Sequence, residues 1–123
     1  MSDKKILIVE DEAHIVEALS FLLEQEGFTI ENHDEGAGVV QKAHEFRPDL
    51  IILDFMLPKF TGLEVFEKLR QAPTLSAIPV LMLTAKGQIK DREAAAEAGV
   101  NIFMTKPFAN QEVIRKVHEL LQP

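Results

Sequence analysis

The stretch LIILDFMLPKFTG, residues 50–62, decides the fold class of the chain. It begins with an unbroken apolar run of strand length that is rich in branched side chains, a pattern typical of a strand covered on both faces. The run ends in Asp54, and a loop that holds Pro58 and Gly62 follows. In open α/β sheets ligands bind at the carboxyl ends of the strands, so the sequence places an aspartate where such a sheet usually carries its site.

The composition is typical of one globular domain spanning residues 1–123, since a second domain does not fit this length. The 46% of hydrophobic and 27% of charged residues argue against disorder and against a membrane span. The apolar segment that follows Lys5 is too short for a signal peptide, so we expect a cytoplasmic protein. The net charge of -7 argues against direct contact with nucleic acid, and the lack of cysteine excludes disulfides and thiolate metal sites.

Hydrophobic periodicity predicts four more strands and five helices around the opening strand. We expect strands over residues 5–9, 28–33, 78–83 and 100–105. We expect helices over residues 13–26, 34–46, 63–71, 91–98 and 110–121, the last one capped by Asn110. Regular alternation of strands and helices predicts a doubly wound α/β fold, in which a five-stranded parallel sheet is the middle layer of a three-layer sandwich.

Polar side chains follow the predicted strands at the points where the strands end. Glu10 and Asp11 follow the first strand, Asp54 the third, Thr84 the fourth and Lys106 the fifth. The carboxyl ends of parallel strands meet at one edge of the sheet, so these residues converge. Two carboxylates about 4 Å apart repel by roughly 4 kcal/mol at an effective dielectric constant of 20, so the group needs a counter-ion. An all-oxygen site of this kind suits Mg2+.

Carboxylates beside Mg2+ are the usual apparatus of phosphoryl transfer, in which positioning and charge neutralisation do most of the work. Asp54 could itself be the nucleophile and form an acyl phosphate. Thr84 could then donate a hydrogen bond to a phosphoryl oxygen, and Lys106 could pair with the same group.

Four motifs, in this order and across nearly the whole chain, resemble the receiver domain of bacterial two-component response regulators, including the single-domain chemotaxis regulators. They are IVEDE at residues 8–12, LDFMLP at 53–58 with Gly62, LTA at 83–85 and TKPF at 105–108. The resemblance implies the strand order 2-1-3-4-5 of this fold. It also implies that Asp54 is the phosphoacceptor.

The resemblance further implies the ligands of the metal ion. Asp11, Asp54 and the backbone carbonyl of Met56 would bind Mg2+, and Glu10, which stands where aspartate is frequent, would act through a water molecule.

The remaining site residues also receive roles from the resemblance. Thr84 and Lys106 would contact the phosphoryl group, and the peptide bond between Lys106 and Pro107 would be cis. Phe103 takes the place of the switch aromatic and, having no hydroxyl group, would act through packing alone. Met56 and Lys86 would flank the phosphoryl group and tune its hydrolysis.

The function implied is a phosphorylation-dependent signalling switch. A histidine kinase or a histidine phosphotransfer protein would donate the phosphoryl group, and the changed surface would control an output protein or effector domain. Such a domain catalyses only its own phosphorylation and dephosphorylation, so we do not expect an enzyme in the ordinary sense. We expect no membrane partner, and a monomer that can dimerise when phosphorylated.

The predicted first helix is more apolar than one buried face requires. Its excess, together with the segment after Lys106, forms a candidate docking patch for the kinase or phosphotransfer protein. The patch comprises Ile15, Ala18, Leu22, Pro107 and Phe108.

Two alternatives share the predicted fold. A phosphatase or mutase with an aspartyl nucleophile would require a second acid two residues after Asp54, and Met56 occupies that position. A flavodoxin-like module would require hydroxyl and amide groups after the first strand to hold a phosphate, whereas Glu10, Asp11 and Glu12 repel one. Turnover of phosphorylated metabolites would indicate the first alternative, and a yellow purified protein the second.

Overall fold

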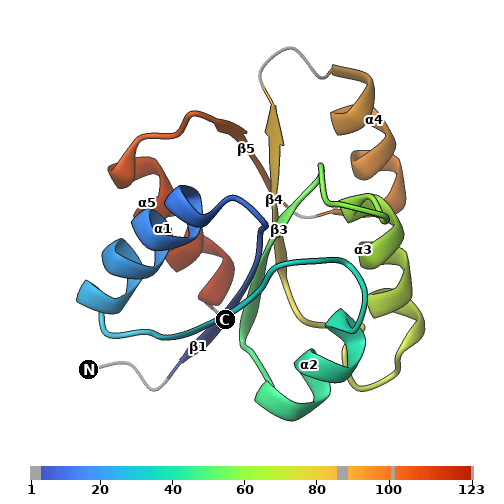
Figure 1. The fold of residues 1–123 in the computed structure, drawn as a ribbon, viewed down its shortest axis with the longest axis horizontal. Coiled ribbons are helices and arrows are strands. Elements are labelled where there is room, and N and C mark those ends of the chain that lie inside the picture. Colours follow the sequence, from blue (N-terminus) through green and yellow to red (C-terminus); the bar gives the residue numbers. More distant parts are fainter. Residues whose placement is uncertain (1–3, 86–88, 101, 123) are drawn as a thin grey trace.

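A computed structural model describes residues 4–85, 89–100 and 102–122 of the chain (Figure 1). The strands are β1 (Lys5–Val9), β2 (Thr29–His33), β3 (Leu50–Asp54), β4 (Val80–Ala85) and β5 (Ile102–Lys106). The helices are α1 (Ala13–Gln25), α2 (Val39–Phe46), α3 (Gly62–Gln71), α4 (Ile89–Ala98) and α5 (Asn110–Leu121). The strands pair in parallel in the order β2-β1-β3-β4-β5, which confirms the predicted fold class and strand order.

The sheet separates two hydrophobic cores, because successive side chains of a strand point to opposite faces. Ile6, Ile8 and Ile52 pack with α1 and α5 on one face. Leu7 and Ile51 pack with α2, α3 and α4 on the other face. Figure 1 shows the same division, with α1 and α5 on one side of the sheet and the other three helices opposite. Because β3 is buried at every position, this strand is the centre of both cores.

Some predicted element boundaries were wrong. Helix α2 begins at Val39 instead of residue 34, because Gly38 adopts a left-handed conformation with a φ of 80° and interrupts the helical backbone. Strand β4 begins at Val80, after Pro79, and runs on to Ala85. Asn110 lies inside α5, whose N-cap is Ala109 and has no side-chain capping bond, so the predicted asparagine cap was wrong.

The start of α3 contains a signal that the sequence analysis missed. Thr61 and Glu64 form a capping box, in which the Thr61 hydroxyl accepts from the Glu64 N–H and the Glu64 carboxylate accepts from the Thr61 N–H. The helix therefore begins at Gly62. The Gly62 N–H donates to the Phe55 carbonyl over 2.7 Å, so the first turn of α3 lies directly against the end of β3.

Only a glycine fits at position 62, although its backbone is not in the left-handed region. A Cβ atom there would lie 2.4 Å from the Asp54 carbonyl oxygen and 2.8 Å from the Phe55 Cα. Both are backbone atoms of the segment that carries Asp54, so neither can move without moving that residue. Gly62 thus allows the helix to approach the strand end.

Within the described parts of the chain, none of the helices has the length and apolar character needed to cross a lipid bilayer.

We predict that Gly62→Ala lowers the free energy of unfolding by about 3 kcal/mol, because the new methyl group overlaps backbone atoms in a packed region. Gly99→Ala is the matched control. Gly99 has a φ of 98° and open space around it, so alanine there is strained by its backbone alone and should cost about 1 kcal/mol. Urea unfolding monitored by circular dichroism measures both values, and equal losses would contradict the steric explanation.

Candidate functional site

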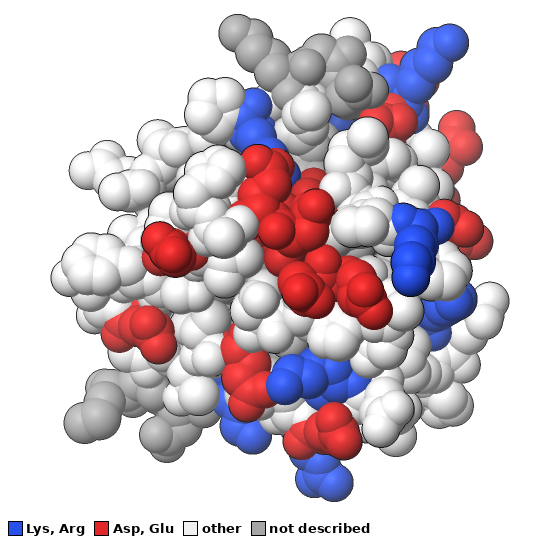
Figure 2. Space-filling model, in the orientation of Figure 1, with Lys and Arg blue, Asp and Glu red and all other residues white. Residues whose placement is uncertain are grey.

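Four strand ends bring polar side chains together at the carboxyl edge of the sheet. Glu10 directly follows β1, Asp54 ends β3, Thr84 is the last residue but one of β4, and Lys106 ends β5. Figure 2 shows acidic side chains gathered near the centre of this face, above the ends of the central strands. The structure therefore brings Glu10, Asp54 and Lys106 into contact and places Thr84 on β4, the strand between Asp54 and Lys106.

Lys106 forms ion pairs with three carboxylates of this group. Its Nζ lies 2.9 Å from Glu10 Oε1, 3.1 Å from Asp54 Oδ2 and 3.4 Å from Glu12 Oε1. Glu10 and Asp54 are almost fully buried, with 0% and 2% of their surface exposed. One ammonium group therefore faces three carboxylates, two of which are removed from water.

Backbone N–H groups hold the two buried carboxylates in place. The Oε2 atom of Glu10 accepts from the N–H groups of Asp11 and Glu12 over 3.0 and 3.1 Å. The Oδ1 atom of Asp54 accepts from the Met56 N–H over 3.1 Å, while Oδ2 faces Lys106. Each carboxylate is thus oriented by the turn that follows its own strand.

The combined effects of burial and neighbouring charges leave the pKa values of both Glu10 and Lys106 raised. Burial raises the pKa of the Glu10 carboxyl and nearby Asp54 adds to the rise, although the Lys106 ammonium partly offsets it. Burial alone would lower the pKa of Lys106, but the carboxylates of Glu10 and Asp54 outweigh this and leave the pKa raised. Lys106 is therefore a permanent positive charge at neutral pH.

The acidic group fits a divalent cation. Glu10, Glu12 and Asp54 can each present an oxygen atom within 4.8 Å of the others. Hard oxygen ligands from carboxylates suit Mg2+. Glu12 was missed as a member of this group by the sequence analysis, although it is the third acid of the run after β1 and could have been found there. Asp11 is exposed and lies outside the group, so its predicted role as a ligand stays a prediction.

Thr84 carries an unsatisfied polar atom. The residue is 1% exposed, and its hydroxyl group has no hydrogen-bond partner among the described residues. A buried hydroxyl without a partner costs about 1–3 kcal/mol, so such groups are usually satisfied. An oxygen-rich ligand at the end of β4 would supply the acceptor that this hydroxyl lacks.

The remaining predicted site residues lie around this group. The Lys106–Pro107 peptide bond is cis, as the resemblance implied. Met56 has 60% of its surface exposed, and Phe103 is half-buried and packs on the core side shared with α4. Lys86 lies outside the described residues.

The predicted docking patch borders a groove next to the acidic group. Ile15, Pro107 and Phe108 line the groove together with Glu12, His14 and Lys106. Ala18 and Pro107 are exposed, whereas Ile15, Leu22 and Phe108 are half-buried and also pack against the core. Phe21, with 65% of its surface exposed, is a large apolar side chain of α1 that the patch did not include.

A doubly wound parallel sheet with carboxylates and a lysine joined at its carboxyl edge is the arrangement of a receiver domain, the phosphorylation-controlled switch of two-component signalling. The model of the response regulator receiver domain matches residues 6–118, and the chain belongs to this family.

Transcriptional regulators are similar to this chain in sequence. It is 42% identical over 120 residues to the alkaline phosphatase synthesis transcriptional regulatory protein PhoP of Bacillus subtilis, covering 98% of this chain and 49% of that protein. It is 38% identical over 119 residues to the phosphate regulon transcriptional regulatory protein PhoB of Escherichia coli, covering 97% of this chain and 52% of that protein. The chain thus spans about half the length of these relatives.

Solved receiver structures have the same fold. A putative response regulator from Chloroflexus aurantiacus superposes with a TM-score of 0.92 at 33% identity, covering 98% of each chain. The receiver domain of a sensor histidine kinase from Pseudomonas aeruginosa superposes with a TM-score of 0.89 at 28% identity, again over 98% of each chain. A magnesium ion is coordinated in the active-site cleft of that second protein.

We predict that Lys106→Met lowers the free energy of unfolding by about 3 kcal/mol at pH 8 without divalent cations, because it leaves buried carboxylates without a counter-ion. The loss should be smaller at pH 5. The pKa of Glu10 is already raised in the folded state, and removing Lys106 raises it further, so the folded variant gains stability by binding a proton as the pH falls.

Urea unfolding at both pH values measures this difference. Lys90→Met, at an exposed lysine of α4, should leave stability nearly unchanged at either pH. If Lys106→Met lowers the free energy of unfolding equally at both pH values, then Lys106 stabilises the fold through packing of its stem and not through its charge.

Proposed function

We propose that Asp54 accepts a phosphoryl group from a phosphohistidine of a histidine kinase or phosphotransfer protein, in a reaction that depends on Mg2+. The observation that supports this proposal is the contact of a buried carboxylate with the Lys106 ammonium, together with the unsatisfied Thr84 hydroxyl near the end of the strand between them. Each of these groups has a use when a phosphoryl group arrives. A purely structural role would explain each of these three groups less well than phosphorylation does.

In the proposed reaction a carboxylate oxygen of Asp54 attacks the phosphorus atom in line with the bond to the donor imidazole. The new P–O bond forms as the P–N bond breaks, and the imidazole leaves with the bonding electrons and takes up a proton. The hydrogen bond from the Met56 N–H and the contact with Lys106 keep the carboxylate oriented, which removes much of the entropic barrier.

The metal ion would be held by oxygen atoms of Glu10, Glu12 and Asp54, with Asp11 and the Met56 carbonyl as the further ligands implied by the resemblance. It would neutralise the charge on the phosphoryl oxygens. Lys106 and Thr84 would stabilise the same oxygens from the side of β4 and β5.

The added charge would then act as the switch. A phosphoryl group carries about -1.5 to -2 charges at neutral pH, which attracts the Thr84 hydroxyl and the Lys106 ammonium. Movement of Thr84 at the end of β4 would let half-buried Phe103 repack on the neighbouring strand. The surface of α4, β5 and α5 would thereby change and control an output protein or an effector domain, and phosphorylation could promote dimerisation through it.

The groove between α1 and the end of β5 is our proposed docking site for the phosphodonor protein. It lies next to Lys106 and exposes apolar surface on Ile15, Pro107 and Phe108. A partner helix or loop seated there would bring a phosphohistidine close to Asp54. The alternative functions are not favoured, because no acid follows Asp54 at the second position and the acids after β1 repel a bound phosphate ester.

We predict that incubation with acetyl phosphate and Mg2+ adds the mass of one phosphoryl group to the intact protein. Asp54→Asn should abolish the addition, and excess EDTA should reduce it strongly because the charge of the site is then not neutralised. Thr84→Ala should slow the reaction about tenfold through loss of one hydrogen-bond donor, whereas Thr84→Ser should retain most of it. Equal addition to Asp54→Asn would contradict the proposed phosphoacceptor.

We also predict that Ala18→Glu slows phosphorylation by a histidine kinase that acts on the wild-type chain, because it adds a charge to the docking patch. The variant should react normally with acetyl phosphate, since Ala18 is exposed on α1 and is not a residue of the acidic group. Glu97→Ala, at an exposed residue of α4, controls for general surface effects. Unchanged transfer from the kinase to Ala18→Glu would remove this patch from the interface.

A further inference from the structure

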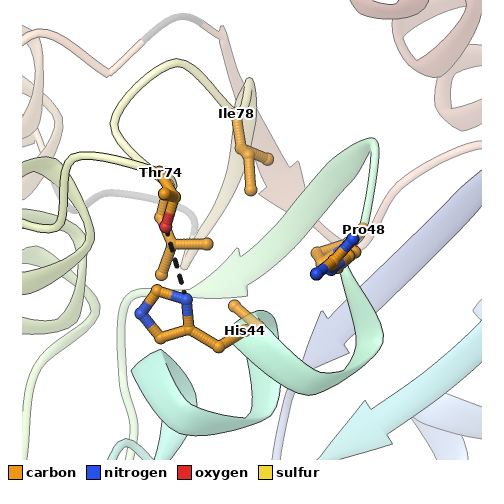
Figure 3. A pocket seen from close by; sticks show the side chains of 7 residues that line it. His44, Pro48, Thr74 and Ile78 are labelled. Carbon is orange, nitrogen blue, oxygen red and sulfur yellow. Dashed lines mark hydrogen bonds between the residues drawn. The ribbon is translucent and has the colours of Figure 1, made fainter.

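A cavity of about 490 Å³ opens at the edge of the sheet opposite to Asp54 (Figure 3). It lies between the last turn of α2, Pro48 in the segment before β3, and the connection from α3 to β4. Its lining residues are Ala43, His44, Arg47, Pro48, Thr74, Leu75 and Ile78. Cavities of roughly 300–1,000 Å³ are the usual size of small-molecule sites.

The cavity combines an apolar floor with a polar rim. Ala43 and Leu75 are buried in the hydrophobic core that α2 and α3 share. His44 and Thr74 lie at the rim, where the Thr74 Oγ1 and the His44 Nδ1 are 3.4 Å apart, and Figure 3 shows the two side chains pointing toward one another across the opening. A few polar groups above an apolar surface are typical of sites that orient a small ligand.

Arg47 has an unusual backbone conformation for an arginine. It ends α2 in the left-handed region, with a φ of 55° and a ψ of 61°, and its N–H donates to the Ala43 carbonyl over 2.8 Å. Helices that end in this way usually carry glycine or asparagine at the position, because a Cβ atom is strained there. Residues held in strained backbone conformations cluster at functional sites such as ligand clamps.

The guanidinium group of Arg47 is available to a ligand. No ion pair among the described residues involves Arg47, although the chain as a whole carries a net charge of -7. Asp49, the nearby acid that follows in the chain, uses its Oδ2 to accept from the Lys5 N–H over 2.8 Å. The Nζ of Lys5 donates to the Phe46 carbonyl over 3.0 Å and adds a second positive charge near this end of α2.

We propose that this cavity binds a small carboxylate with an apolar body. The planar guanidinium of Arg47 would hold the carboxylate through two parallel hydrogen bonds, with Thr74 as a further donor. The apolar body would cover Ala43, Leu75 and Ile78. The site shares no residue with the acidic group at Asp54, so it is a function additional to phosphorylation.

Titration of the 15N-labelled chain with 2-naphthoate tests the proposal by NMR. Saturable shifts should appear at the backbone amides of His44, Arg47, Thr74 and Leu75, and Arg47→Gln should weaken binding by about tenfold, the loss expected for a charge-assisted contact. Neutral 2-naphthamide and inorganic phosphate should each bind much more weakly than 2-naphthoate. Binding of the amide as tight as that of the acid, or of phosphate alone, would overturn the proposal, as would the absence of saturable shifts at these residues.

Two further variants distinguish ligand binding by Arg47 from the loss of any surface arginine and from a role of Arg47 in stability. Arg115→Gln, at an exposed arginine of α5, should bind 2-naphthoate as the wild type does. Arg47→Gly should raise the melting temperature by relieving the left-handed strain and should still lose the ligand. A lower melting temperature would show that Arg47 serves stability and would count against the site. Arg47→Gln should react with acetyl phosphate at the wild-type rate, so failure of one proposal leaves the other intact.

Discussion

The contact of the Lys106 ammonium with three carboxylates is the interaction on which the site depends. Lys106 ends β5, whereas Glu10 follows β1, and β3 and β4 lie between these two strands. A lysine bridges this width because its stem has four carbon atoms, which a shorter cation could not match. The stem also places its charge between Glu10 and Asp54, whose carboxylates would otherwise repel each other in a medium of low dielectric constant.

The same site keeps groups that folding alone would not retain. The Thr84 hydroxyl is buried without a partner, and Glu10 is a buried acid whose pKa is raised by burial. Both features destabilise the fold by themselves, and one lysine cannot compensate for all of them. In the proposed function an anion and a cation complete the site, because phosphoryl oxygens would satisfy Thr84 and a metal ion would neutralise the acids. The unsatisfied groups would thus favour the phosphorylated state, which the proposed switch requires.

Much of the fold and part of the site could be predicted from the sequence. Periodicity and strand-end chemistry located the sheet, Asp54 and Lys106, because a parallel sheet necessarily brings its carboxyl ends together. The first turns of two helices were harder to place, since the late start of α2 depends on the left-handed backbone of Gly38 and the start of α3 at Gly62 depends on a capping box at Thr61. The close approach at Gly62 and the missing partner of Thr84 depend on positions in space that no sequence pattern records, whereas Glu12 stands in the acidic run after β1 and could have been found there.

The two proposed sites lie at opposite ends of the central strands, which bears on whether they communicate. Coupling between sites requires an element with two arrangements that both ligands bias. At the proposed phosphorylation site the element that we propose is Thr84 with half-buried Phe103, on β4 and β5. The Arg47 cavity is lined instead by the end of α2, Pro48 and the connection from α3 to β4, and its floor of Ala43 and Leu75 is packed in the hydrophobic core. A ligand beside Arg47 therefore has nothing bistable to act on, and we expect it to bind the phosphorylated and unphosphorylated chain equally.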